Sequence, residues 1–323
     1  MKTTSRITIL ISILILFSQC KQEIKLKPQK LTGNNPVAFT DVIYKSGRDT
    51  VFVSTYGGHI YEIINNKTKK KKIALLDDEI YSMAYNSSTK QIYAATLNSG
   101  IAVIDAENGK LIKTLKLKET WAHKLTYNQQ SKLLATSDFK GNHYIWNTAD
   151  NFRILETPKK IRNAQPKYIT DNGIIYFNKR NEVLVWNTQT NQIFSHSLTG
   201  TLEDVDKNNN LLVIGGKQFA LYNTSTDSLV YKNKHPNWPI YLKDKDSFVN
   251  VPLTLEIVSG KLGNNTIYTA GLDKTIRKWK KSTGSLEETL KKHRASISAI
   301  SLNKNKSQLV SVDLSGTIYF WEL

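Results

Sequence analysis

The chain has 323 residues, of which 40% are apolar, and a formal net charge of +18 at pH 7. This composition supports a large buried core, but the length exceeds the size at which single hydrophobic cores usually stop growing. An excess of basic residues suggests nucleic acid as a partner. The lysines, however, are scattered and not interleaved with aromatic residues, so we expect no nucleic-acid partner.

The first twenty residues are predicted to be a targeting segment outside the fold. Lys2 and Arg6 precede the apolar run 7–17, which fits a secretory signal and is too short to span a bilayer. Cys20, the one cysteine, follows at a position that resembles a bacterial lipoprotein box. The resemblance implies lipidation of Cys20 and an exported, membrane-held protein of the cell envelope, most simply an outer-membrane lipoprotein on the periplasmic or surface side. An ordinary signal peptide with an incidental thiol is the alternative.

Residues 24–31 alternate like a β-strand, and Pro28 keeps this strand from a central position in a sheet. The last repeat of the chain stops at Leu323, directly after its third predicted strand. We therefore expect residues 24–31 to supply the outermost strand of that repeat, where they would protect its edge.

From residue 39 onward, short alternating strands are separated by Asn, Gly, Ser and Asp, which is the pattern of an all-β fold. One motif recurs: a β-branched strand, a polar turn and an alternating strand that ends in a large apolar residue. Trp279 and Trp321 hold this last position 42 residues apart. Self-similarity at about 40–45 residues is typical of four-stranded propeller blades. The equivalent positions are Ile63, Ile104, Trp146, Trp186, Tyr222, Trp279 and Trp321.

We therefore predict an all-β, seven-bladed β-propeller over residues 21–323, closed by the N-terminal strand and preceded by the signal peptide at residues 1–20. Each blade packs only on its two neighbours, so such a ring is not limited by the size of one core. The first five blades are expected at residues 39–76, 79–117, 121–159, 162–198 and 202–234. The fifth repeat is the most degenerate, which leaves six or eight blades as alternatives.

The motifs GLDKTIRKW (271–279), SVDLSGTIYFW (311–321) and ATSDFKGNHYIW (135–146) resemble those of the WD-repeat β-propellers. In that family an Asp and the Trp join a Ser or Thr and a His in a structural hydrogen-bond network. The resemblance implies this network for His293, Ser311, Asp313 and Trp321 in the last blade. It implies a related role for Asp273 and Trp279 in the sixth blade. The second repeat, at residues 98–115, looks more like the bacterial YVTN or quinoprotein-type repeat.

The step from Tyr222 to Trp279 is 57 residues, the longest of the series, and the excess falls in residues 235–250. A connection between two blades emerges on the face where propellers usually bind partners. It presents Trp238, between two prolines, and then Tyr241. Such aromatics are common interface anchors, and proline stiffening lowers the entropy lost on binding. The alternative is that both side chains fold back to cover an imperfect blade.

The sequence holds no local catalytic or metal-binding motif, because its six histidines are dispersed and it has neither a P-loop nor a G-x-S-x-G motif. We therefore expect no metal, no cofactor and no enzymatic activity, but a scaffold that binds a protein or peptide in the envelope and the membrane through lipidated Cys20. Aromatic side chains would anchor the partner and arginines would pair with its carboxylates. The predicted partner-binding residues are Trp121, His123, Arg162, Trp238, Tyr241 and Arg294. The alternatives are an enzyme or small-ligand binder of the lactonase or quinoprotein type, and an accessory lipoprotein of outer-membrane assembly.

Overall fold

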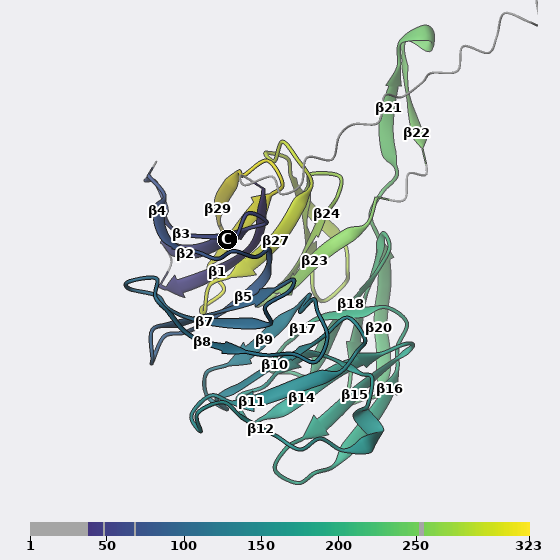
Figure 1. Ribbon diagram of the computed structural model, residues 1–323. Helices are drawn as coiled ribbons and strands as arrows, with labels where there is room; N and C mark the ends of the chain where they lie inside the picture. Colours follow the sequence, from purple (N-terminus) through teal and green to yellow (C-terminus); the bar gives the residue numbers. More distant parts are fainter. Residues whose placement is uncertain (1–37, 48, 68, 252–254) are drawn as a thin grey trace, which may run out of the picture. The chain divides into compact units, whose positions relative to one another are not determined.

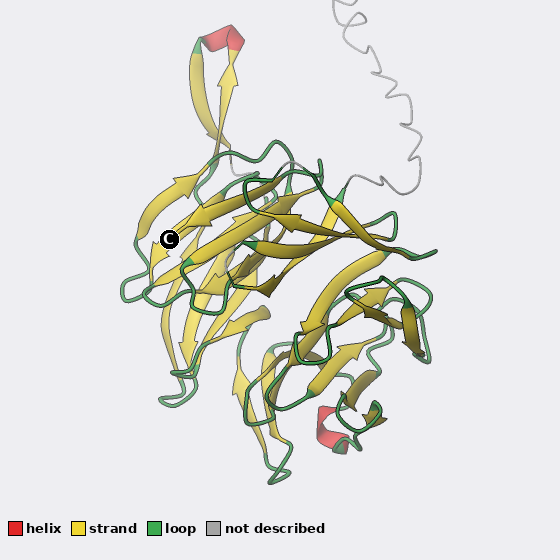
Figure 2. Cartoon of the chain, turned by 90° about the vertical axis from the view of Figure 1, so that its left-hand side faces the viewer, coloured by secondary structure: helices red, strands yellow, loops and turns green. Residues whose placement is uncertain are grey.

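The computed structural model describes residues 38–47, 49–67, 69–251 and 255–323 (Figure 1). The chain divides into a unit of residues 1–33 and a unit of residues 34–323, and the second unit is the one described below. The predicted signal peptide, Cys20 and the predicted strand at residues 24–31 lie outside the described residues. Strands dominate the described residues, whose helical segments are two 3₁₀ turns, η1 (Lys159–Ile161) and η2 (Lys243–Lys245) (Figure 2).

Seven of the sheets are antiparallel meanders, in which strands that follow one another along the chain also pair in the sheet. The first two sheets contain β1 (Phe39–Ser46), β2 (Thr50–Thr55), β3 (His59–Ile64) and β4 (Lys71–Leu75), then β5 (Ile80–Asn86), β6 (Gln91–Thr96), β7 (Ile101–Asp105) and β8 (Leu111–Leu115). The next two contain β9 (Leu125–Asn128), β10 (Leu133–Ser137), β11 (His143–Asn147) and β12 (Arg153–Ile154), then β13 (Gln165–Ile169), β14 (Ile174–Lys179), β15 (Glu182–Asn187) and β16 (Ile193–Ser197).

The fifth and sixth sheets contain β17 (Thr201–Val205), β18 (Asn210–Gly215), β19 (Gln218–Asn223) and β20 (Ser228–Lys234), then β23 (Ile257–Leu262), β24 (Thr266–Gly271), β25 (Ile276–Lys280) and β26 (Leu286–Leu290). The seventh contains β27 (Ile297–Leu302), β28 (Gln308–Asp313) and β29 (Ile318–Glu322). Each sheet is one blade, and the predicted all-β propeller of seven blades is confirmed in the described residues. That residues 24–31 add a fourth strand to the seventh blade stays a prediction.

The core of the ring lies between the blades, because each apolar cluster combines side chains of two neighbouring sheets. The recurring apolar position takes part in every cluster and is buried throughout: Ile63, Ile104, Trp146, Trp186, Tyr222, Trp279 and Trp321. Trp321, for example, packs with Tyr268 of the sixth blade. Ile63 packs with Val310 and Val312 of the seventh, so the first and last blades meet. Burial of these positions removes apolar surface from water at every blade junction.

The blades approach one another closely at Gly109, in the turn between β7 and β8. Its φ is +73°, a conformation that L side chains rarely adopt. A Cβ placed on it would lie 1.8 Å from the carbonyl oxygen of Ile73 in the first blade. Both the backbone conformation and the space between two blades therefore require glycine here.

The long connection between the fifth and sixth blades is not irregular. It forms a two-stranded sheet of its own, β21 (Trp238–Leu242) and β22 (Ser247–Val251), joined by η2. Figures 1 and 2 show this hairpin standing away from the blades. Tyr241 is 46% exposed and contacts Phe248 across the hairpin, with ring centroids 5.3 Å apart. Tyr241 therefore does not fold back into a blade, and the first strand of the sixth blade begins only at Ile257.

Candidate binding site at the central channel

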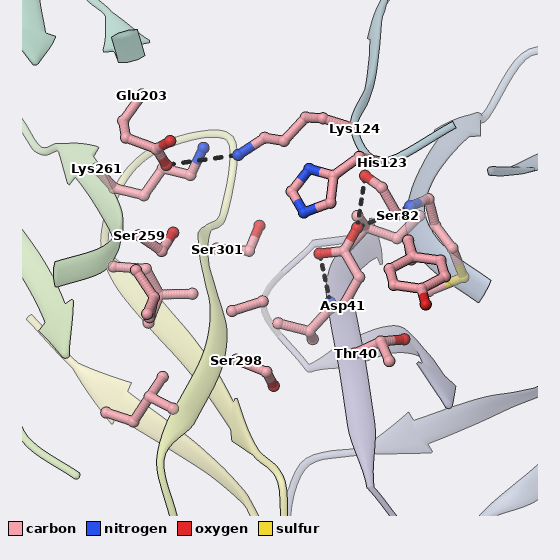
Figure 3. A pocket seen from close by; sticks show the side chains of 18 of the residues that line it. Thr40, Asp41, Ser82, His123, Lys124, Glu203, Ser259, Lys261, Ser298 and Ser301 are labelled. Atoms are coloured by element: carbon pink, nitrogen blue, oxygen red, sulfur yellow. Dashed lines mark hydrogen bonds and ion pairs between the residues drawn. The ribbon is translucent and has the colours of Figure 1, made fainter. Parts of the chain in front are cut away.

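The innermost strands of the ring surround a cavity of about 650 Å³. Its walls come from β1, β5, β17, β23 and β27, together with the residues around the start of β9. Figure 3 shows the side chains that face this space, among them Asp41, Lys124, Glu203 and Ser301. The volume falls in the range of pockets that hold small ligands in other proteins.

A β-bulge in the innermost strand recurs around the ring. In β1, β5, β13, β17, β23 and β27 the pairing with the second strand skips one residue. Such a bulge re-aims a side chain. The skipped residues are Thr40, Tyr81, Lys167, Glu203, Val258 and Ser298, and all except Lys167 line the cavity. Six of the seven blades therefore carry this bulge, and in five of them the skipped residue lines the channel.

An ion pair joins the third blade to the fifth inside the cavity. Lys124 Nζ lies 3.4 Å from the Glu203 carboxylate, whose side chain is 6% exposed (Figure 3). The charge of Glu203 raises the pKa of Lys124. A buried carboxylate without a partner would be costly, so Glu203 keeps the Lys124 side chain charged and turned inward.

Two aspartates of the innermost strands connect neighbouring blades. Asp41 accepts hydrogen bonds from the Met83 amide at 2.7 Å and the Ser82 hydroxyl at 3.1 Å, both in the second blade. Asp204 accepts one from the Leu262 amide of the sixth blade at 2.8 Å. Burial raises the pKa of Asp41, although these hydrogen bonds favour its charged form. The two carboxylates therefore hold neighbouring blades together.

Basic groups gather beside Lys124. Burial, with the charges of Lys167 and Lys124, lowers the pKa of His123. Burial and the charge of Lys124 lower the pKa of Lys167 to about 8. Lys261 lines the cavity from β23. Within the described part of the chain, neither Lys167 nor Lys261 makes a hydrogen bond or ion pair.

An aromatic cluster lies at one mouth of the cavity, on the first three blades. The Tyr81 ring, which lines the cavity, has its centroid 5.6 Å from Tyr56, 5.7 Å from Trp121 and 6.2 Å from His123. Trp121 stacks on Phe139 at 6.0 Å, and Phe139 is 69% exposed. Tyr81 is the second residue of β5, and the other four lie in connections before a first strand or after a second strand, which emerge on the same face of a meander-built ring. We call these five residues the mouth cluster.

Trp121 is held in an unusual conformation within the mouth cluster. Its φ is +64°, a region that costs residues with a Cβ roughly 1–2 kcal/mol. Its amide donates to the Leu97 carbonyl at 2.5 Å. Its indole Nε1 is buried and has no hydrogen-bond partner among the described residues. Backbone strain of this kind persists only where the surroundings impose it, so the indole is rigidly placed and has an unused donor.

The structure brings together two of the six predicted partner-binding residues. Trp121 and His123 contact each other, with centroids 5.3 Å apart. Arg162 is exposed at the end of η1, beside a separate cavity of about 270 Å³ next to His143. Arg294 is exposed before β27, and its amide donates to Asp313 at 3.3 Å. Tyr241 is on the hairpin, and the side chain of Trp238 lies outside the described ones.

The four network residues of the last blade are hydrogen-bonded in series. His293 Nδ1 lies 2.9 Å from the Asp313 carboxylate, and its Nε2 lies 2.6 Å from Ser311 Oγ. Trp321 Nε1 donates to Ser311 Oγ at 2.8 Å. A carboxylate only accepts, so His293 carries its proton on Nδ1 and accepts from the serine hydroxyl. Burial lowers the pKa of His293, in keeping with a neutral ring.

The sixth blade has a related network with members that lie far apart in sequence. Trp279 Nε1 donates to Thr269 Oγ1 at 2.8 Å, and His235 Nε2 lies 2.7 Å from the same oxygen. Arg277 contacts both His235 Nδ1, at 2.8 Å, and the Asp273 carboxylate, at 2.6 Å. The hairpin β21–β22 is inserted between His235 and the first strand of this blade, which hides the relationship in the sequence.

In the ranges that the structure describes, no three His, Cys, Asp or Glu side chains form a group that could hold a metal ion. The same ranges contain no helix long and apolar enough to cross a membrane.

The arrangement defines a class: a seven-bladed propeller with a polar central channel and an aromatic mouth on one face. Residues 284–322, at the end of the sixth blade and in the seventh, match the family model for the WD domain, G-beta repeat. No curated protein matches the sequence.

The fold is similar to the WD40 β-propeller domain of Doa1, with a TM-score of 0.69 and 12% identity over 89% of this chain and 93% of that one. It is also similar to the β-propeller domain of Cps50 (Swd1) from Myceliophteria thermophila, with a TM-score of 0.68 and 13% identity over 88% of this chain and 96% of that one. At these identities the likeness concerns the fold, which is that of a WD40 β-propeller.

Proposed function

We propose that this chain is a non-enzymatic scaffold that binds a protein or peptide at the mouth of its central channel. The usual role of WD40 propellers supports the class of function. The main support for this location of the binding site is the stacking of exposed Phe139 on Trp121, whose backbone is fixed in a left-handed conformation. Rigid aromatic side chains lose little entropy on binding and are typical interface anchors.

The hairpin is the second contact in this proposal. It lies in a connection before a first strand, as Trp121 and His123 of the mouth cluster do. Tyr241 and Phe248 face one side of the hairpin, and Leu242 and Val249 lie on the other; all four are exposed. A lone two-stranded hairpin is at best marginally stable in water. Burial of both apolar sides against a partner would therefore stabilise the hairpin as well as the complex.

Capture from an envelope extract tests the proposal. The wild-type protein is compared with Phe139→Ala, and with Phe194→Ala as a matched control. Phe194 is 57% exposed on β16, away from the mouth cluster. We expect the wild type and Phe194→Ala to hold the same protein in stoichiometric amount, and Phe139→Ala to hold at least roughly tenfold less, since interface anchors contribute about 2 kcal/mol or more. Equal capture by both variants would remove the mouth cluster from the proposed site.

We also propose that the scaffold is anchored in the cell envelope through an acylated Cys20, a proposal that rests on the sequence pattern at residues 1–20. Two or more acyl chains give durable membrane attachment. Intact-mass measurement of the protein from its native membrane should show a diacyl or triacyl modification that Cys20→Ser lacks. A wild-type mass without lipid would leave the signal-peptide alternative.

A further inference from the structure

We propose that the basic side of the central cavity, formed by His123, Lys124, Lys167 and Lys261, binds a small oxyanion that carries a phosphate or carboxylate group. This activity differs from partner binding at the mouth, although His123 belongs to both sites. His123, Lys124 and Lys261 line one cavity of about 650 Å³, and Lys167 occupies the bulge position of β13 beside Lys124.

Three acidic side chains line the cavity together with His123, Lys124 and Lys261. Glu203 pairs with Lys124, and Asp41 already accepts hydrogen bonds from the second blade. Glu256, the third acidic lining residue, directly precedes β23. Lys167 and Lys261 remain without an ion pair or hydrogen bond to any described residue. The ammonium groups of Lys261, in the cavity, and of Lys167, beside Lys124, favour an anion, because each gains a charge-assisted hydrogen bond from it.

The walls supply hydroxyl groups for the rest of such a ligand. Ser259 and Ser301 line the cavity, and neither makes a hydrogen bond within the described residues. Figure 3 shows both side chains among those that line the cavity. A ligand whose charged end meets the lysines would place its remaining polar atoms against these hydroxyls. We therefore expect a hydrophilic anion and not an apolar one.

The lowered pKa values of His123 and Lys167 agree with this geometry, since burial and the neighbouring lysines disfavour their protonated forms more than the charge of Glu203 favours them. A bound anion favours the charged forms. Binding near pH 8 should therefore be accompanied by proton uptake. Binding by permanently charged surface lysines would take up no protons.

Titration calorimetry of the whole protein tests the proposal, with inorganic phosphate and succinate as separate probes and glycerol as a neutral control. We expect saturable binding of at least one anion and an enthalpy at pH 8 that depends on the buffer's ionisation enthalpy. Lys167→Gln and Lys261→Gln should each weaken binding by about tenfold, since a charge-assisted hydrogen bond is worth roughly that factor. Lys116→Gln, a change at an exposed lysine outside the cavity, should leave the affinity unchanged.

The result with each probe decides between the two sources of the oxyanion. Phosphate binding alone identifies a phosphate-bearing ligand, and succinate binding alone identifies a carboxylate-bearing one. Failure of both anions to bind would overturn the proposal, as would binding that both lysine variants retain. Thermal melts of each variant separate loss of the site from loss of the fold.

Discussion

Arg277 donates a hydrogen bond from Nη1 to Nδ1 of His235 over 2.8 Å. A guanidinium has no acceptor, so Nδ1 of His235 is the lone-pair nitrogen and the ring proton is on Nε2, facing Thr269. His293 in the next blade faces a carboxylate through Nδ1 and carries its proton there. Two neighbouring blades therefore hold their network histidines in opposite tautomers.

The opposite tautomers can be observed directly. We expect ¹⁵N spectra of histidine-labelled protein at pH 7 to show a protonated Nε2 for His235 and a protonated Nδ1 for His293, each assigned by the loss of its signals when that histidine is replaced by Gln. The reason is the different partner of Nδ1 in the two blades, Arg277 in one and Asp313 in the other. The same tautomer in both residues would contradict the assignment.

Acid should destabilise the protein through His235. Burial and the charge of Arg277 lower the pKa of His235 to about 3, whereas the unfolded chain takes up this proton near pH 6.5. The unfolded state therefore binds more protons between these values, and the free energy of unfolding falls as the pH decreases from about 6.5 towards 3. From pH 7 to 4.5, urea denaturation should show a loss about 2–3 kcal/mol larger in the wild type than in His235→Gln. Equal losses would show that His235 is not held neutral.

The ion pair between Arg277 and Asp273 should contribute far more to the free energy of unfolding than an ion pair on the surface. Arg277→Leu leaves the buried Asp273 carboxylate unpaired and removes the donor to His235, so we expect a loss of about 3–5 kcal/mol of unfolding free energy. Arg153→Leu is the control, because the Arg153–Asp150 pair is exposed. That change should cost less than about 1 kcal/mol. Similar denaturant midpoints for the two variants would contradict the assigned role of Arg277.

Gly109 and Gly216 both have a left-handed backbone. Alanine variants at the two positions distinguish the cost of the backbone conformation from the cost of crowding between blades. Gly109→Ala brings a Cβ against the Ile73 carbonyl, whereas a Cβ at Gly216, with φ +57°, meets nothing within 4 Å. We expect Gly216→Ala to cost roughly 1–2 kcal/mol from backbone conformation alone. Gly109→Ala should cost clearly more, because two blades must also move apart. Equal thermal shifts would indicate that the blades are not tightly packed at this turn.

Removal of the predicted closing strand should destabilise the whole ring. β29 is the third described strand of the seventh blade, and residues 24–31 are predicted to pair beside it. A chain of residues 33–323 should melt at least roughly 5 °C below one of residues 21–323, since a loss of 1 kcal/mol lowers the Tm of a domain of 150–250 residues by roughly 2–4 °C. An unchanged melting temperature would mean that the seventh blade closes without these residues.

The sequence alone determined the features that depend on local pattern. Alternation of apolar and polar residues sets the strands, and the recurrence of Trp146, Trp186, Tyr222, Trp279 and Trp321 sets the blades. These signals suffice because a propeller blade is a local meander whose strands pair with their neighbours along the chain. The last-blade residues His293, Ser311, Asp313 and Trp321 also follow one another closely, so resemblance to known repeats was enough to name them.

Only the tertiary structure decided which side chains meet across the ring. Lys124 and Glu203 are 79 residues apart and belong to blades that are not neighbours, so no local pattern joins them. Tyr81 and Glu203 reach the channel because a bulge shifts the register of their strands. The sequence shows the alternation of apolar and polar residues in these strands but not the shift in register. His235 is separated from its blade by the inserted hairpin. In each case the deciding quantity is the pairing register or the closure of the ring, which local alternation does not specify.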